Sequence, residues 1–144
     1  TNSTTPVLLS TPIKIDGSGN TTFSGYIVST NSTAGIGYAS GAGGTVTQAT
    51  SKSTAVTINK ISGEITMNGA SLAAAASVSF TLNNSTIALQ DVVKVTTQGG
   101  LTSTYSAISY ALQSGSCVIK VTNEGTTQSE AVKINFTVIK GTKT

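Results

Sequence analysis

The chain has 144 residues, of which 9% are charged and none is histidine. Soluble domains usually carry about 25% charged residues, so this chain is unusually poor in charge. Its eight cations are all lysine, they are scattered along the sequence, and the formal net charge is only +3. A chain without arginine or a basic cluster does not predict a nucleic-acid partner. The lack of histidine also excludes Ser–His and Cys–His catalytic pairs and the usual zinc ligand sets.

The N-terminal region is the least regular part of the sequence. It contains both prolines, Pro6 and Pro12, and one turn-forming stretch, 16–20. We expect an extended arm with a β-hairpin over residues 1–35 and a single β-sandwich domain over residues 36–144. The apolar run 7–9 is too short for a signal peptide or a transmembrane segment, so no membrane partner is predicted.

Apolar residues of this arm need a dry environment, and an extended segment finds one most easily on another subunit. These residues are our candidate interface, on a partner or a sister subunit: Val7, Leu8, Leu9, Ile13 and Ile15.

Apolar and polar residues alternate with a period of two in nearly every later segment, which predicts β-strands. The expected strands are Phe23–Ser29, Val46–Thr50, Ala55–Lys60, Glu64–Met67, Ser77–Leu82, Val92–Thr97, Ile108–Leu112, Cys117–Thr122 and Val132–Val138. Turns rich in Gly, Asn and Ser separate them. The stretch 71–80 is rich in alanine, but we expect a loop that leads into a strand. The pattern predicts an all-β chain, an antiparallel β-sandwich of immunoglobulin-like or jelly-roll type.

The alternation also predicts which residues share a face of a strand. In the last strand Val132, Ile134, Phe136 and Val138 lie on one face, and Lys133, Asn135 and Thr137 lie on the other. In an earlier strand Ile108, Tyr110 and Leu112 share a face. Cys117 alternates with Ile119 and Val121, so we interpret it as a small buried hydrophobe and not a reactive thiol.

The carboxylates are far apart in sequence and mostly lie beside turns: Asp16, Glu64, Asp91, Glu124 and Glu130. We interpret them as solvated charges and not as a glycosidase pair or a calcium site. The glycine-rich stretch 41–46 leads into a strand, whereas a phosphate-binding loop leads into a helix. The four tyrosines, Tyr26, Tyr38, Tyr105 and Tyr110, are scattered over several segments, which favours core and interface positions over a shared carbohydrate platform. The sequence therefore predicts no enzyme, no catalytic residue, no cofactor, no metal and no small-molecule substrate.

The segments GAGGTVTQATSKSTAVTINK, DVVKVT and SEAVKINFTVIKG lie between Gly35 and Gly141. This part of the chain resembles a recurrent small virion structural protein of tailed bacteriophages and prophages, of the capsid decoration (cement) type or another virion surface type. The first 34 residues lie outside the resemblance. It implies a non-enzymatic protein that is made in the host cytoplasm, binds the assembled phage head on its outer surface and stabilises it. The implied partner is the major capsid protein, and a homotrimer on a three-fold axis is the natural symmetry.

Three other functions are open on the sequence alone. The first is a tail or head-fibre module that contacts the host surface, and the second is a bacterial immunoglobulin-like adhesin domain. The third is a carbohydrate-active enzyme, which would have to use Glu64 or Glu130. A surface rich in Ser and Thr and poor in charge is weakly protected against association, which suits a protein that works in an assembly.

Overall fold

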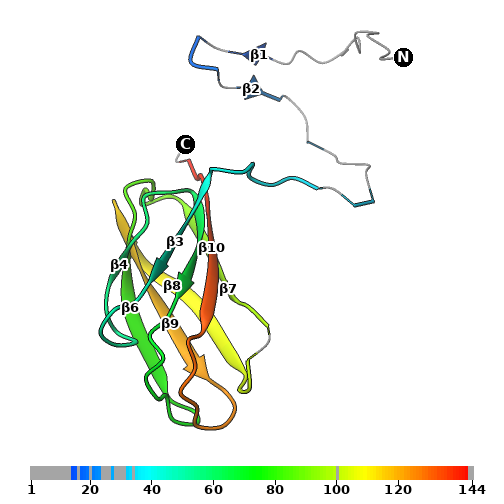
Figure 1. Ribbon diagram of the computed structural model, residues 1–144. Coiled ribbons are helices and arrows are strands. Elements are labelled where there is room, and N and C mark those ends of the chain that lie inside the picture. Colours follow the sequence, from blue (N-terminus) through cyan, green and yellow to red (C-terminus); the bar gives the residue numbers. More distant parts are fainter. Residues whose placement is uncertain are drawn as a thin grey trace. The chain divides into compact units, whose positions relative to one another are not determined.

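The computed structural model describes residues 14–15, 17–19, 21–23, 27, 32–33, 35–99 and 101–142. The chain divides into two units, residues 1–37 and residues 38–144. Every regular element in the described part of the chain is a β-strand, so the protein is all-β (Figure 1). No helix among these residues is long and apolar enough to cross a membrane.

The first unit contains one short hairpin. Its strands β1 (Lys14–Ile15) and β2 (Thr21–Thr22) are antiparallel, and Ile15 is the Cα partner of Thr21. Gly19 lies in the connection with a φ of 81°, a conformation that glycine adopts readily.

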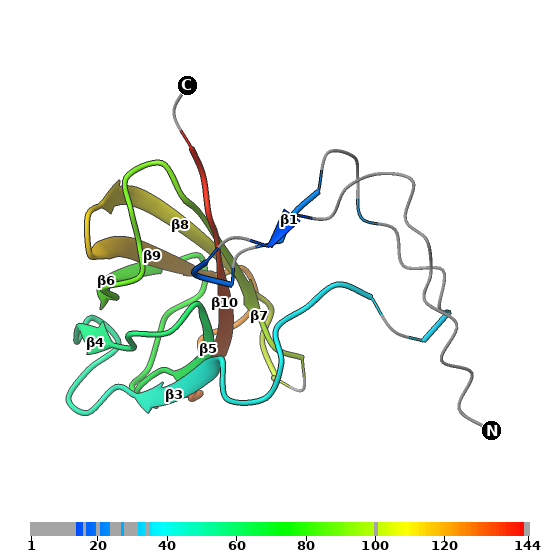
Figure 2. The same cartoon turned by 90° about the horizontal axis from the view of Figure 1, so that it is seen from above.

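The second unit consists of two four-stranded sheets, which lie in two layers when viewed end-on (Figure 2). The first sheet has the order β3 (Gly43–Thr47), β5 (Ser62–Thr66), β10 (Lys133–Ile139) and β7 (Val92–Thr97). The second sheet has the order β4 (Val56–Thr57), β6 (Ser77–Asn83), β9 (Ser116–Asn123) and β8 (Tyr105–Gln113).

Both sheets are mixed, so the expectation of a purely antiparallel arrangement is wrong at one edge of each. β3 runs parallel to β5, and β4 runs parallel to β6, whereas all other neighbours are antiparallel. The reason lies in the path of the chain. From β3 to β8 it alternates between the two sheets and reverses at each crossing, so strands two apart in sequence point the same way. The last two strands, β9 and β10, then lie between strands that point in the opposite direction.

The two sheets share one core, built from the inward-facing residues of their strands. Buried members from the first sheet include Ile65, Val93, Val95, Ile134 and Phe136, and buried members from the second include Phe80, Leu82, Cys117, Ile119 and Val121. The predicted inward face of the last strand is confirmed, because Val132, Ile134, Phe136 and Val138 are all buried. Each such side chain stabilises the fold by about 1.5–3 kcal/mol through removal from water.

Cys117 is a free, buried cysteine, as predicted. Burial raises the pKa of its thiol to about 11, which keeps it protonated and unreactive at neutral pH.

Strand β8 differs from the expectation that apolar faces point inward. Ile108 and Tyr110 are exposed on the outer face of the second sheet, and it is Tyr105 and Ala107 that face the core. A register shift follows Tyr110, where Ala111 has a φ of 49°. This bulge turns Leu112 back, so that it packs against the core although it shares the sequence alternation of the two exposed residues.

Strand boundaries in the first half of this unit also differ from those expected. β3 begins at Gly43, three residues before the predicted start, and β4 is only two residues long. The predicted strand 23–29 lies largely outside the described residues. The early start of β3 depends on glycines that permit close approach of backbones: a Cβ on Gly63 would lie 2.5 Å from the carbonyl oxygen of Gly44 and 2.8 Å from the Phe136 ring.

Replacing Gly63 with alanine tests this packing. We expect Gly63→Ala to lower the free energy of unfolding by about 1–3 kcal/mol, because β3 and the Phe136 ring must move to admit the methyl group. Gly69→Ala is the control, since a Cβ there meets no atom within 4 Å. It should change stability by no more than a few tenths of a kcal/mol. Equal effects of the two variants in urea denaturation would contradict the proposed close packing.

Candidate interaction surfaces

The described residues contain no group of three or more His, Cys, Asp or Glu side chains that could hold a metal ion. The acids also lie apart. Glu64 is on the outer face of the first sheet, Asp91 is just before β7, and Glu130 is in the connection between β9 and β10. Asp16 lies outside the described residues. Glu64, Asp91 and Glu130 therefore lie on separate elements and form no carboxylate pair for acid–base chemistry with one another.

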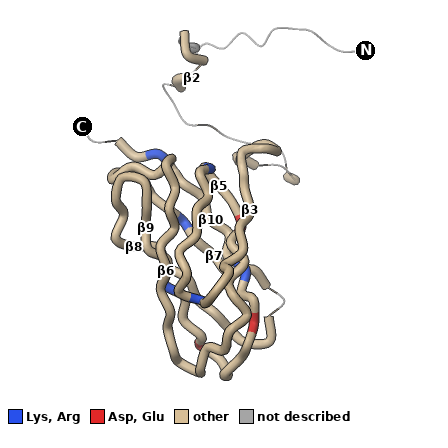
Figure 3. The backbone as a smooth tube through the Cα atoms, turned by 60° about the vertical axis from the view of Figure 1, so that its left-hand side comes forward, with Lys and Arg blue, Asp and Glu red and all other residues tan. Residues whose placement is uncertain are grey.

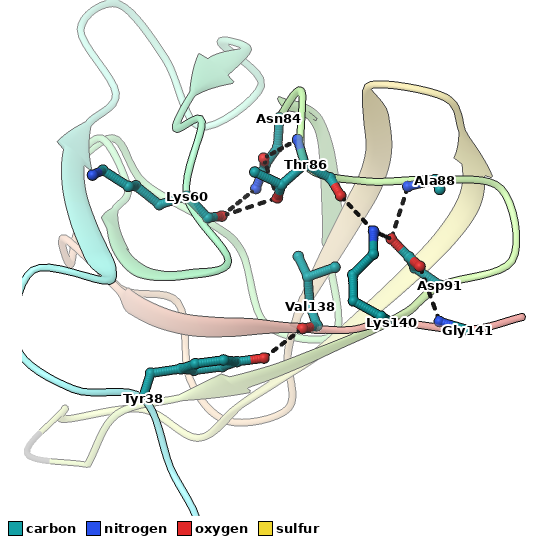
Figure 4. Close-up of polar contacts among 9 residues, drawn as sticks. All are labelled: Tyr38, Lys60, Asn84, Thr86, Ala88, Asp91, Val138, Lys140 and Gly141. Atoms are coloured by element: carbon teal, nitrogen blue, oxygen red, sulfur yellow. Dashed lines mark hydrogen bonds and ion pairs between the residues drawn. The ribbon is translucent and has the colours of Figure 1, made fainter. Parts of the chain in front are cut away.

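Asp91 is buried and fastens the end of β10, so its prediction as a solvated charge is wrong. Its carboxylate accepts hydrogen bonds from the backbone N–H groups of Ala88, at 2.8 Å, and Gly141, at 3.0 Å (Figure 4). It also pairs with Lys140 Nζ at 2.5 Å, and that ammonium donates to the Thr86 carbonyl at 2.8 Å. The Lys140 hydrogen bond, followed by the two backbone donors, lowers the pKa of Asp91 to about 2.

Two further contacts order the same end of the unit. Asn84 is fully buried, and its Nδ2 donates to the Lys60 carbonyl at 2.7 Å while its Oδ1 accepts from the Thr86 N–H (Figure 4). The Tyr38 hydroxyl donates to the Val138 carbonyl at 2.8 Å. The first residue of this unit and the end of its last strand are thus held together.

The pH dependence of stability tests the Asp91 contacts. An unfolded aspartate has a pKa near about 4. Because the folded pKa is lower, Asp91 contributes stability that is fully present above that value and is lost as the pH falls towards about 2. We expect Asp91→Asn to be less stable than the wild type at pH 7, and the difference should shrink between pH 4 and pH 2. Denaturant unfolding over this range measures it, with Glu124→Gln, at an exposed site, as the control.

The opposite end of the unit is closed by buried polar side chains that the sequence did not reveal. Asn123 is fully buried: its Oδ1 accepts from Ser103 Oγ and the Gly125 N–H, and its Nδ2 donates to the carbonyls of Leu72 and Thr126. All four hydrogen-bonding positions of its amide are therefore used. This one side chain links three loops.

Glu130 and Lys52 complete this end. The Glu130 carboxylate accepts from the N–H groups of Thr102 and Ser103 and from the Tyr105 hydroxyl, and the Thr102 contact contributes most to lowering its pKa. Burial raises the pKa of Tyr105 to about 12, and the hydrogen bond to Glu130 is the second cause of this rise. Lys52 Nζ donates to the carbonyls of Asn68 and Glu130, and burial lowers its pKa. Glu130 was predicted to be a solvated charge, but it is half-buried and structural.

Removing the Asn123 amide should be costly. Asn123→Ala leaves several buried donors and acceptors without partners, each at a cost of about 1–3 kcal/mol, so we expect at least about 3 kcal/mol of destabilisation. The matched control is Asn135→Ala, on the exposed face of β10, which should cost below about 1 kcal/mol. Chemical denaturation measures both, and a similar loss in the two variants would show that the loops do not depend on Asn123.

The centre of the outer face of the first sheet is polar and internally paired, while Val92 and Ile139, which are Cα partners and are 57% and 54% exposed, form an apolar pair at one end of this face. Lys133 Nζ lies 2.9 Å from Glu64 Oε1, and Gln98 Nε2 donates to Glu64 Oε2 at 2.6 Å and to Asn135 at 3.1 Å. Threonines of all four strands surround this cluster: Thr45, Thr47, Thr66, Thr96 and Thr137. Charged residues are few and dispersed along the backbone (Figure 3).

The outer face of the second sheet is less polar. Ile108 is 55% exposed and Tyr110 is 43% exposed, and half-buried Val118 and Lys120 lie beside them on β9. We call these four residues the β8–β9 patch. Short polar side chains surround it: Ser77, Ser79, Thr81, Ser106, Ser116 and Thr122.

Two concave sites of this unit are shallow and carry little chemistry. A hollow of about 570 Å³ lies beside Tyr38 and is otherwise lined by glycines, Ala39 and the hydroxyl residues Ser40, Thr45 and Ser62. It contains no carboxylate, lysine or cysteine. A second hollow of about 200 Å³ lies between β7 and β8 and contains Lys94 as its one charged side chain. Neither arrangement provides a nucleophile with an adjacent base.

The structure places few of the interface residues predicted from the sequence. Val7, Leu8, Leu9 and Ile13 lie outside the described residues, and Ile15 is described only as part of β1. Of the four tyrosines, Tyr105 is buried, Tyr38 lies beside the C-terminal end of β10, and Tyr110 lies on the outer face of the second sheet. These three therefore form no common platform. Tyr26 lies outside the described residues.

Comparison with known proteins gives no relative. No protein-family model, no curated protein and no solved structure matches this chain. The resemblance to phage virion proteins therefore stays a prediction.

Proposed function

We propose that the protein is a non-enzymatic attachment protein of a phage virion, a decoration protein that binds the assembled head. The observation that carries the proposal is the contrast within the second unit. Its ends are fixed by buried hydrogen-bond networks, whereas the outer face of the second sheet exposes Ile108 and Tyr110 among short hydroxyl side chains. Such a surface loses little side-chain entropy on binding and removes apolar area from water.

Decoration requires binding to the assembled shell in preference to free coat subunits, since only then does it stabilise the shell. A compact unit with a partly apolar face, preceded in the chain by a separate N-terminal unit, suits this task because two contacts on one chain reinforce each other. The major capsid protein is the proposed partner, and a trimer on a three-fold axis is the proposed arrangement. The extended character of residues 1–35, and an immunoglobulin-like or jelly-roll type for the second unit, belong to the same proposal.

The location of the protein on purified particles tests this function. A decoration protein is abundant over the whole head, so an image reconstruction should show its density across the shell. Density confined to the tail or to one vertex would contradict decoration and support the alternative, a fibre module that contacts the host surface. Absence from particles, together with secretion from a bacterium, would support the adhesin alternative.

Deletion of residues 1–15 tests the arm. We expect this deletion to abolish binding to heads that lack the protein, because it removes Val7, Leu8, Leu9, Ile13 and Ile15. The stability of the second unit should change by no more than about 0.5 kcal/mol, since it is a separate unit. Deletion of residues 1–5 removes only polar residues and is the control, for which binding should persist. Cosedimentation with heads measures both, and unchanged binding after the longer deletion would rule out a role for the arm.

A further inference from the structure

We propose that the β8–β9 patch is a protein-docking face, and that its partner is a protein surface that presents a carboxylate to Lys120. The inference rests on the proposed attachment function and assigns the face that carries it. Four observations support it: the edges at β7 and β8 are protected, the patch is exposed, the Tyr110 side chain is held in place, and the patch carries one sign of charge.

The edges at β7 and β8 do not offer free strands to a partner. Where β7 adjoins β8, Ser109 Oγ donates to the Val93 carbonyl, and Thr97 Oγ1 donates to the Tyr105 carbonyl at 3.1 Å. These hydroxyls bond edge carbonyls that an added strand would otherwise use. On the other side β4 is only two residues long, and Lys60 Nζ lies 3.4 Å from the Gly41 carbonyl just before β3. Short strands and nearby lysines are devices that oppose strand addition, which favours binding to a face.

Both outer faces expose an apolar pair, Val92 and Ile139 on the first sheet and Ile108 and Tyr110 on the second, but the centres of the two faces differ. On the first sheet the central acid, Glu64, is already bonded to Lys133 and Gln98. A partner that docked there would have to break these contacts or bury the Glu64–Lys133 ion pair, and either change costs free energy. On the second sheet Ile108 and Tyr110 sit side by side on one strand face and are about half exposed. Burial of apolar side chains is the main source of affinity in protein interfaces, and tyrosine is enriched at their centres.

Tyr110 is held in a defined orientation. Its Cα partner is Val118 on β9, yet its hydroxyl lies 3.3 Å from Ser79 Oγ on β6, which is the strand beyond β9. The side chain therefore crosses β9 and lies along the sheet instead of projecting from it. The bulge at Ala111 immediately follows, in a backbone conformation that costs a non-glycine residue about 1–2 kcal/mol. Bulges of this kind re-aim neighbouring side chains, and an oriented aromatic side chain loses less entropy on binding.

The charge of the patch defines the partner. Lys120 lies on β9 opposite Ile108, and none of the strand positions on this face is acidic. A two-fold contact centred on the patch would bring the Lys120 side chains of two copies into the same small area, which disfavours face-to-face self-association. A neutral apolar partner would leave the ammonium without a counter-charge. A partner surface with a carboxylate opposite Lys120 supplies the counter-charge for its ammonium group.

Matched surface variants on the two sheets test the inference. Ile108→Ser and Lys120→Glu change the patch. Val92→Ser makes the same apolar-to-polar change on the outer face of the first sheet, where Val92 is 57% exposed, and Lys60→Glu reverses the charge of an exposed lysine outside the patch. Binding to heads of the encoding phage that lack this protein is measured by cosedimentation over a range of salt concentrations. We expect Ile108→Ser to weaken binding roughly tenfold and Lys120→Glu at least as much, with a reduced salt dependence in the latter. The controls should bind like the wild type, and thermal unfolding verifies that all four variants fold.

The possible failures are distinguishable. If the wild type binds heads and the patch variants bind equally well, the docking face is wrong and the attachment function stands. If the wild type does not bind heads, the attachment function fails, and the inference fails with it. Analytical ultracentrifugation of the free protein adds a further criterion: an oligomer that Ile108→Ser dissociates would identify the patch as a self-contact and overturn the carboxylate-bearing partner. Binding of a glycan array that Tyr110→Ser abolishes would overturn it in favour of a saccharide.

Discussion

The fold depends on the pairing of the last two strands at the centre of both sheets. β10 is hydrogen-bonded to β5 and β7, and β9 is bonded to β6 and β8, so neither sheet is complete until the C-terminal third of the chain is in place. These pairings join residues far apart in sequence, and the loop entropy of such contacts is lost before they contribute stability. The contacts of Asp91 with Lys140 and Gly141 then fix the end of β10 against the connection that precedes β7.

The few charged residues of the chain have structural roles in the second unit, including at both of its ends. Three of the four acids in the described part of the chain are bonded within the fold: Asp91 and Glu130 to backbone N–H groups, and Glu64 to Lys133 and Gln98. Lys52 and Lys140 likewise bond backbone carbonyls of distant loops. Several of the few charges therefore hold loops in place. What is left on the second sheet is a surface of hydroxyls with a small apolar centre, which is better suited to contact than to solubility.

The strand content of the second unit was predictable because a two-residue period leaves little ambiguity about which residues share a face. β7 and β10 were located almost to the residue, and the inward face of β10 was correct. The direction in which an apolar face points was not predictable for β8, because Ile108 and Tyr110 alternate as a core strand would. Their neighbours on β9 decide the matter: Val121 and Ile119 fill the core and pair with Ala107 and Ser109. The buried structural roles of Asp91, Lys52 and Asn123 were not predicted for a related reason. Polar residues near turns give the same sequence signal whether they are solvated or bonded to a distant loop.

Strand β8, whose apolar residues Ile108 and Tyr110 face solvent instead of the core, also carries the proposed docking face. The two facts have a common physical basis. A sequence alternation fixes which residues lie together but not which side is solvated, and an exposed apolar cluster on a strand face is a candidate contact surface. In the proposed function the arm and the patch have different thermodynamic roles. An extended segment that becomes ordered on binding loses much conformational entropy and gains affinity mainly when it is already held near its site. A preformed face such as the β8–β9 patch loses little, and binding there raises the effective concentration of the arm at the same surface. Weak contacts of the two kinds on one chain therefore favour an assembled surface, where both sites are present at a fixed spacing, over free subunits, where they are not.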